Sequence, residues 1–153
     1  MPVEFLPRAE ECTCLSVRQA ARHITQFYDQ HLATSGLRAT QFSILAKIAR
    51  LGPLTINALA EELVMDRTTL GRNILPLERE GLIRVEPGRS DRRSKELVLT
   101  EPGRQRLRLA TEGWRRAQSE FAARFGDART QDLRAILNKV WATELPPVPS
   151  SSR

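Results

Sequence analysis

One short run of the sequence, EPGRSDRRSKE at residues 86–96, is strongly basic. It holds three arginines and one lysine around a single aspartate, Asp91. Clustered guanidinium groups attract phosphates, and a projecting tip of this kind suits the narrow minor groove of DNA. We expect Arg89 and Arg92 to contact phosphates, and Asp91 to fix the direction of a neighbouring arginine through a charge-assisted pair.

A second polar group follows Asp66, which is a good N-cap for a helix over residues 66–80. Hydrophobic side chains recur on one face of that helix, and the polar ones point away from it. The residues assigned to the outward face and its flank are Arg67, Thr68, Thr69, Arg72 and Arg79. Arg72 is our candidate for reading a base, because one guanidinium can bond both O6 and N7 of guanine. An ordinary solvated helix face is the alternative, which the basic run beside it disfavours.

These two groups need elements that position them. Alternating hydrophobic residues predict strands over 82–86 and 96–100, so the basic run becomes the tip of a β-hairpin. Pro76 is expected to bend the 66–80 helix without ending it, because the hydrophobic spacing continues across the proline. With a short helix capped by Thr55 before it, this order describes a winged helix-turn-helix.

Four further helices are predicted: 11–33, 41–51, a long one capped by Thr100, and 130–145. A chain of 153 residues with 41% hydrophobic residues is long enough to bury a core, and we expect one compact unit. The expected fold class is therefore mainly α with a small β-hairpin wing.

Composition narrows the classes of function. The net charge of +6 favours a polyanionic partner, although a solvated basic face would give the same total. The chain has no apolar run of the roughly 18 residues that a membrane span needs, so we expect no membrane partner and a cytoplasmic location. A Gly-rich phosphate loop, a nucleophile elbow and a convergent carboxylate pair are all missing, so neither an enzyme nor a cofactor is expected.

Residues 64–103, VMDRTTLGRNILPLEREGLIRVEPGRSDRRSKELVLTEPG, resemble the core of the MarR family of bacterial regulators. The most specific marks are Asp91-Arg92-Arg93, the following ELVLTEPG, and LEREGLIR. The resemblance implies that Arg93 enters the minor groove with Asp91 as its brace, and that the helix beginning at Asp66 lies in the major groove. It also places a cap where Arg38 stands, so we expect Thr40 to cap the 41–51 helix.

The resemblance implies an obligate homodimer that binds double-stranded DNA. The expected organisation is a helical dimerisation region over 1–35 and 101–146, a winged helix-turn-helix domain over 36–100, and a disordered tail over 147–153. Independently of the resemblance, the apolar stripes of the first helix and of the last two helices are more extensive than the DNA-binding domain alone could bury. A two-fold dimer would bind a pseudo-palindromic operator with half-sites about one helical turn apart. A winged-helix module used only for protein contact is a remote alternative, against which the basic tip argues.

Family resemblance also implies a small aromatic or phenolic effector that releases the protein from DNA. Its candidate pocket residues share an aromatic ring: His23, Phe27, Tyr28, Phe42 and Trp114. For each of them, an aromatic residue packed in the core is the simpler interpretation.

Two cysteines, Cys12 and Cys14, offer an alternative. Placed on one helix they would lie about 200° apart, so a bond between them is not expected. Cys14 stands where the organic-peroxide-sensing branch of the family has its cysteine; that resemblance assigns Tyr28 as one partner, while Arg18 replaces the other. A nearby arginine and a helix start would favour the thiolate. A small buried apolar cysteine is the alternative, and the spacing of the cysteines and histidines does not predict a metal site.

Overall fold

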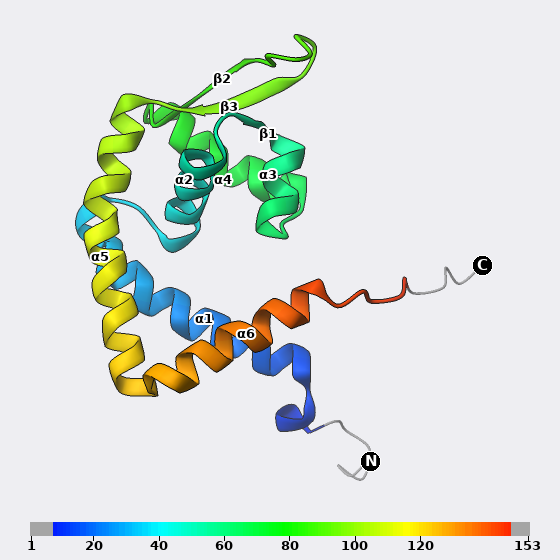
Figure 1. The fold of residues 1–153 in the computed structure, drawn as a ribbon, viewed down its shortest axis with the longest axis vertical. Helices are drawn as coiled ribbons and strands as arrows, with labels where there is room; N and C mark the ends of the chain where they lie inside the picture. The colour runs from blue at the N-terminus through cyan, green and yellow to red at the C-terminus, as the bar shows by residue number, and fades with distance from the viewer. Residues whose placement is uncertain (1–7, 148–153) are drawn as a thin grey trace, which may run out of the picture. The chain divides into compact units, whose positions relative to one another are not determined.

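The computed structural model describes residues 8–147 (Figure 1) and divides the chain into two compact units, Met1–Ala117 and Gln118–Arg153. The sequence led us to expect a single unit, and the division falls inside the long fifth helix. From residue 148 onward, the tail predicted at 147–153 lies outside the described residues.

The first unit begins with helices that lead into a compact lobe. A short 3-10 helix η2 (Ala9–Glu11) precedes α1 (Thr13–Leu32), and a second one, η3 (Ala33–Ser35), follows it. Helix α2 (Ala39–Leu51) then enters the lobe and buries Ile44, Leu45 and Ile48. Both helices lie within two residues of their predicted ranges.

The start of α2 corrects one prediction, because its cap is not Thr40. The side chain of Asp29 on α1 accepts a hydrogen bond from the Ala39 N–H at 2.7 Å, and Gln41 Oε1 accepts one from the Arg38 N–H at 3.0 Å. A free amide at a helix start can be satisfied by any nearby acceptor, including one from another helix. Asp29 therefore also ties α1 to α2.

A helix-turn-helix follows. Helix α3 (Ile56–Leu63) is capped by Thr55, whose Oγ1 accepts from the Ala58 N–H at 3.1 Å, as predicted. Helix α4 (Arg67–Arg79) runs without a break through Pro76, which confirms that the proline does not end it. Gly81, with a φ of 72°, then turns the chain into the sheet.

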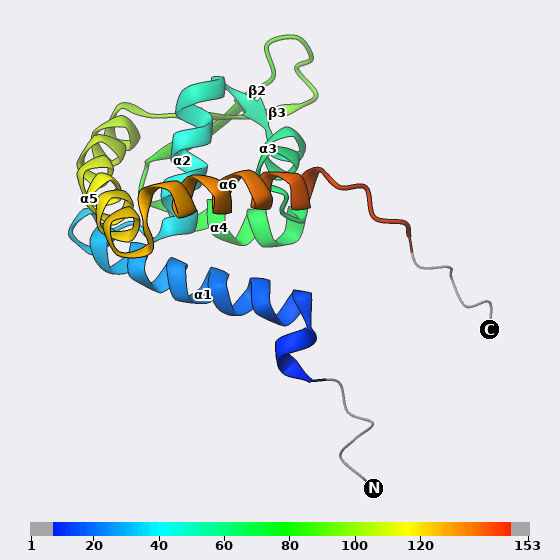
Figure 2. The ribbon, with the colours of Figure 1, turned by 60° about the horizontal axis from the view of Figure 1, so that its bottom comes forward.

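The sheet has three antiparallel strands in the order β1-β3-β2. Strands β2 (Ile83–Pro87) and β3 (Lys95–Leu99) form the predicted hairpin, with Val85 opposite Leu97. The sequence did not indicate β1 (Leu54–Thr55), which pairs with β3. The hairpin loop projects beyond the helices of the first unit (Figure 2).

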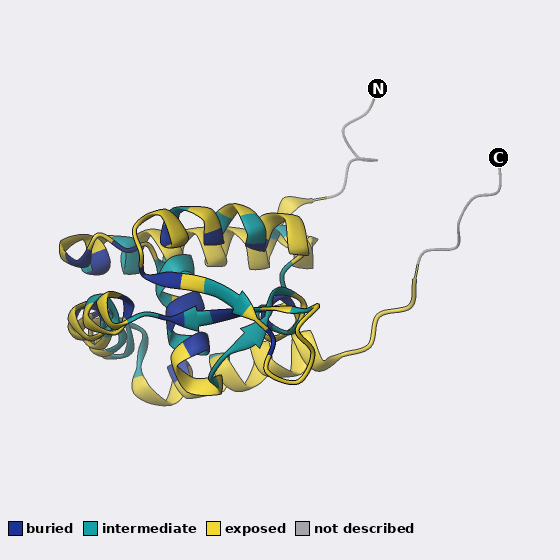
Figure 3. Ribbon diagram, turned by 90° about the horizontal axis from the view of Figure 1, so that it is seen from above, coloured by how far each residue is buried: buried dark blue, intermediate teal, exposed yellow. Residues whose placement is uncertain are grey.

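The core of the first unit lies between the helix-turn-helix and the sheet. Its largest fully buried side chains are Leu32, Ile44, Leu45, Ile48, Leu59, Leu70, Leu77, Leu82, Ile83 and Leu97. In Figure 3 dark blue marks the buried residues of the strands and yellow the exposed hairpin loop. The core therefore packs against one face of α4 and of the wing strands, and their polar faces remain exposed to solvent.

Helix α5 (Glu101–Phe125) starts directly after β3, with the Thr100 hydroxyl accepting from the Gly103 N–H at 3.1 Å, as predicted. Two of its glycines touch other backbones. A Cβ at Gly103 would collide with the carbonyl oxygen of Leu82, and one at Gly113 with that of His31. The helix is thus seated closely at two points, one beside the end of α4 and one beside the end of α1.

The second unit contains the end of α5 and helix α6 (Asp127–Ala142), which begins three residues before its predicted start. Phe121 and Phe125 stack at 5.3 Å between ring centroids, and the Arg129 guanidinium lies 4.4 Å from the Phe125 ring. Large apolar side chains of α6 face solvent, namely Ile136, Leu137, Val140 and Trp141.

Candidate nucleic-acid interface

The start of α4 is held by Asp66, as predicted. Its Oδ1 accepts from the Thr69 N–H at 2.8 Å, and its Oδ2 accepts from the Thr69 hydroxyl at 2.6 Å. The hydrogen bond from the Thr69 hydroxyl, followed by that from the Thr69 backbone, lowers the pKa of Asp66 below its usual value. Thr69 is therefore engaged with the cap as well as exposed on the surface.

The two faces of α4 divide as the sequence predicts. Leu70, Ile74 and Leu77 are buried. All five predicted DNA-facing residues of this helix are exposed: Arg67, Thr68, Thr69, Arg72 and Arg79. The helix therefore presents hydroxyl and guanidinium groups from its first turns.

Inside the wing, Asp91 organises the turn through backbone atoms. Its Oδ1 accepts from the Arg93 N–H at 2.9 Å, and its carbonyl accepts from the Ser94 hydroxyl at 2.7 Å. Within residues 8–147 the Asp91 carboxylate forms no ion pair with an arginine. The predicted brace therefore acts on the main chain of Arg93. In a tight turn, a short side chain reaches the N–H group two residues later more easily than it reaches a guanidinium group.

The wing cations differ in their surroundings. Arg89 Nε lies 3.8 Å from Glu96 Oε2, with the Arg89 side chain 75% exposed. No carboxylate in the described part of the chain pairs with Arg92 or Arg93, and both are exposed. These two guanidinium groups remain available to an external anion.

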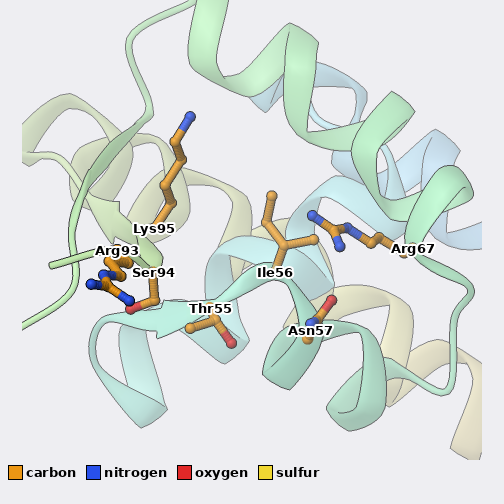
Figure 4. Close-up of a pocket in the computed structure, with 7 residues that line it drawn as sticks. All are labelled: Thr55, Ile56, Asn57, Arg67, Arg93, Ser94 and Lys95. Carbon is orange, nitrogen blue, oxygen red and sulfur yellow. The ribbon is translucent and has the colours of Figure 1, made fainter. Parts of the chain in front are cut away.

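A hollow of about 410 Å³ lies where the base of the wing meets the starts of α3 and α4. We call it the wing-base hollow, and its lining residues are Thr55, Ile56, Asn57, Arg67, Arg93, Ser94 and Lys95. Figure 4 shows the side chains of Arg93 and Arg67 on either side of Ile56. The hollow thus combines cations from the wing with one from α4.

Thr55, Asn57, Ser94 and Lys95 are lining residues that the sequence analysis did not assign to the interface. Thr55 was predicted only as the cap of α3. A signal was present, because hydroxyl and amide side chains at a helix start commonly bond phosphates. It becomes visible only when β1 brings α3 against the wing.

A second hollow, of about 430 Å³, lies between α2 and α5. We call it the α2–α5 hollow, and it is lined by Phe42, Ser43, Ala46, Lys47, Arg50, Leu63, Thr111 and Trp114. The rings of Phe42 and Trp114 stack at 6.0 Å between centroids. Two of the five predicted effector residues therefore meet here.

The other three predicted effector residues lie on α1 and do not line this hollow. His23 is exposed, while Phe27 and Tyr28 are half-buried. Phe27 packs against His31, with 4.4 Å between ring centroids. The described hollow therefore gathers Phe42 and Trp114 but not the aromatic residues of α1.

Both cysteines are exposed. Cys12 is the N-cap of α1, outside the helix, and its Sγ accepts from the Leu15 N–H at 3.4 Å. The expected 200° separation assumed that both cysteines lie inside one helix, so it does not apply. Cys14 and Tyr28 lie on the same continuous helix about 21 Å apart at 1.5 Å per residue, so one chain alone does not bring them together.

Residues 8–147 contain no helix that is long and apolar enough to cross a membrane. The same residues include no cluster of three or more His, Cys, Asp or Glu able to hold a metal ion.

Comparison with known proteins identifies the family. The sequence model of the MarR family matches residues 37–95, which contain the helix-turn-helix, strand β2 and the hairpin loop. A protein of Thauera aromatica described as a transcriptional regulatory protein for the hcr operon is 32% identical over 124 residues, covering 81% of this chain and 70% of that protein. The chain belongs to the MarR family.

Solved structures of the MarR family extend this result. The transcriptional regulator MosR of M. tuberculosis has 37% identity and a TM-score of 0.75, over 89% of this chain and 100% of that one. MosR has also been solved in complex with DNA, where the identity is 39% and the TM-score 0.73, over 88% of this chain and 99% of that one. This MarR-family chain is a DNA-binding transcriptional regulator, and its relatives are regulators rather than enzymes.

Proposed function

We propose that the protein is a repressor that binds a pseudo-palindromic operator as a homodimer. Helix α4 enters the major groove and the wing enters the minor groove. The observation that carries this proposal concerns Arg92 and Arg93 of the wing, which are exposed and pair with no carboxylate among residues 8–147. Arg93 also lines the same hollow as Arg67 of α4. Phosphate contacts would fix the register, and Arg72 would read a base.

Exposed apolar side chains support the homodimer. Ile136 is 59% exposed, Val140 50% and Trp141 64%, and all three lie on α6. Such a stripe is costly in water and is typical of a surface that a partner covers. A second copy of the chain would bury the same stripe on both subunits, as a two-fold interface requires.

The test uses a duplex of about 30 base pairs recovered from a random pool by the protein itself. Affinity should fall steeply as the salt concentration rises, because binding releases counterions from the phosphates. Arg72→Ala should lose about 10- to 100-fold on this duplex and little on random DNA. An affinity independent of salt would contradict DNA binding, and equal losses on both duplexes would contradict base reading by Arg72.

We also propose that a small aromatic effector releases the protein from DNA. The α2–α5 hollow supports this part, since it places a stacked ring pair beside two cationic side chains. Its volume of about 430 Å³ is in the range of small-molecule sites.

Redox control through Cys14 is the second candidate, favoured by the exposure of both thiols. Arg18 lies one helical turn from Cys14, while Tyr28 would have to come from the second subunit. Cys14→Ser should then remain on DNA when an organic hydroperoxide is added, under conditions that release the wild type. Equal release of the variant and the wild type from DNA would contradict redox control through Cys14.

A further inference from the structure

We propose that Gly71 and Leu75 of α4 form an apolar notch that receives the methyl group of a thymine in the major groove. Leu75 supplies the apolar side chain, and Gly71 supplies the room for the edge of the base to approach the helix. Of the four bases, thymine alone displays a methyl group in that groove. This inference rests on the entry of α4 into the major groove proposed above, and it adds a second base-reading position beside Arg72.

Leu75 interrupts the division of α4 into a buried apolar face and an exposed polar face. It is 49% exposed, whereas the other two leucines and the isoleucine of the helix are buried. At about 100° per residue, Leu75 lies about 140° from the buried Leu70 and within about 20° of the exposed Thr68. The exposed half of the Leu75 side chain is therefore covered only when another molecule lies against the outward face of α4.

Gly71 lies one turn before Leu75, and the packing of the chain does not require it. A Cβ at Gly71 would meet no atom within 4 Å, whereas one at Gly103 or Gly113 would collide with a carbonyl oxygen. Alanine would be more favourable than glycine inside this helix. Residues four apart are neighbours on a helix surface, so the missing side chain leaves a notch beside Leu75.

Two polar side chains near the notch are bonded to the helix itself. The Thr69 hydroxyl donates to Asp66 Oδ2 at 2.6 Å, and Asn73 Nδ2 donates to the Thr69 carbonyl at 2.9 Å. The outward stripe of the middle turns therefore consists of Thr68, Gly71 and Leu75, with Arg72 beside it. Base reading by these turns combines one guanidinium group with one apolar notch.

The chemistry of the notch selects thymine. A leucine side chain offers neither a donor nor an acceptor, so it would leave the amino group of adenine or cytosine, or the O6 atom of guanine, without a partner. Opposite thymine, the methyl group and the leucine side chain are removed from water together. The same contact cannot be made from the minor groove, where no methyl group is displayed.

The experiment replaces each thymine of the selected duplex, one at a time, with deoxyuridine, which lacks only the methyl group. At one position of each half-site, the replacement should weaken binding of the wild type about three- to fivefold. Leu75→Ala should bind the original duplex about three- to tenfold more weakly and should not distinguish the two bases at that position. A wild type that is insensitive to every replacement would overturn the proposal, and so would equal sensitivity of the variant.

Leu51→Ala is the matched control, because Leu51 is also a leucine near the surface with 49% of its area exposed, but it lies at the end of α2. This variant should keep the full preference for thymine over deoxyuridine. Loss of the preference in both variants would overturn the assignment of the methyl contact to Leu75.

Gly71→Ala tests the notch, since its effects on stability and on DNA binding should have opposite signs. The added methyl group meets open space and favours the helix, so the midpoint of urea unfolding should rise. On the selected duplex, the same group occupies the place of the thymine methyl, and affinity should fall about three- to tenfold. An affinity equal to or above that of the wild type would overturn the role of Gly71.

The salt series and Arg72→Ala separate this inference from the proposed function. If binding of the selected duplex falls steeply with salt and Arg72→Ala loses affinity on it, but deoxyuridine has no effect at any position, the inference alone fails. If the wild type binds no duplex, or binds all sequences equally, the proposed function fails and this inference fails with it.

Discussion

The wing-base hollow and the α2–α5 hollow have nearly the same volume, about 410 and 430 Å³. Their linings differ. The first combines cations with hydroxyl and amide groups, whereas the second sets two cations beside a stacked pair of aromatic rings. An open cationic surface suits a long polyanion, and an aromatic wall suits one small planar anion. The volume of a hollow therefore does not identify its ligand; the chemical types of the side chains that line it do.

The largest expected effect on this contrast comes from Arg93. Arg93→Ala should weaken binding to the selected operator by about 10- to 100-fold, because it removes the guanidinium proposed for the minor groove. Arg92→Ala is the matched control and should cost less, as expected for one phosphate contact. Binding curves for the two variants decide the matter, and equal losses would reduce the wing to a charged patch.

A smaller effect separates the two lysines. Lys95→Gln in the wing-base hollow should reduce the slope of log affinity against log salt by about one, uniformly across sequences. Lys47→Gln in the α2–α5 hollow should leave that slope unchanged in the absence of ligand. If both variants changed the slope equally, the two hollows would belong to one DNA-binding surface.

The smallest expected effect is a pH dependence at Asp66. Because folding lowers its pKa, the carboxylate stabilises the folded state above the unfolded pKa of about 3.9, and this contribution is lost as the pH falls from there through the lower folded pKa. Asp66→Asn keeps an oxygen acceptor but does not titrate, so its free energy of unfolding should depend less on pH in that window. Urea unfolding followed by circular dichroism measures both proteins, and parallel pH profiles would contradict the assignment.

Much of the helix-turn-helix and wing was predictable, because helix caps and hydrophobic spacing depend on residues close together in the sequence. Asp66 and Thr55 bond amides three residues away, and the spacing of Leu70, Ile74 and Leu77 reports the buried face of one helix. What was missed depends on contacts between distant segments. Strand β1 has too few residues to show an alternation, and the cap of α2 comes from Asp29, ten residues upstream of the amide it binds.

The candidate sites follow the same division. The exposed face of α4 and the exposed wing cations agree with the sequence, while the bond of Asp91 goes to a main-chain N–H rather than a guanidinium. Lys47 and Arg50 were not assigned, because cations on an amphipathic helix usually mark a solvated face. Lys47 and Arg50 line a hollow together with Trp114, which lies on a helix more than sixty residues later in the chain. A contact between segments this far apart cannot be read from the sequence of α2.

The two closely seated glycines of α5 make the length of that helix a fixed quantity. Gly103 and Gly113 are about 15 Å apart at 1.5 Å per residue, and each faces a carbonyl oxygen of another segment. Inserting one residue between them would turn the second contact by about 100° and bring a side chain against His31. This stretch should therefore accept many substitutions at its exposed positions but no insertion or deletion. The number of residues between the two glycines thus sets the distance between the ends of α4 and α1.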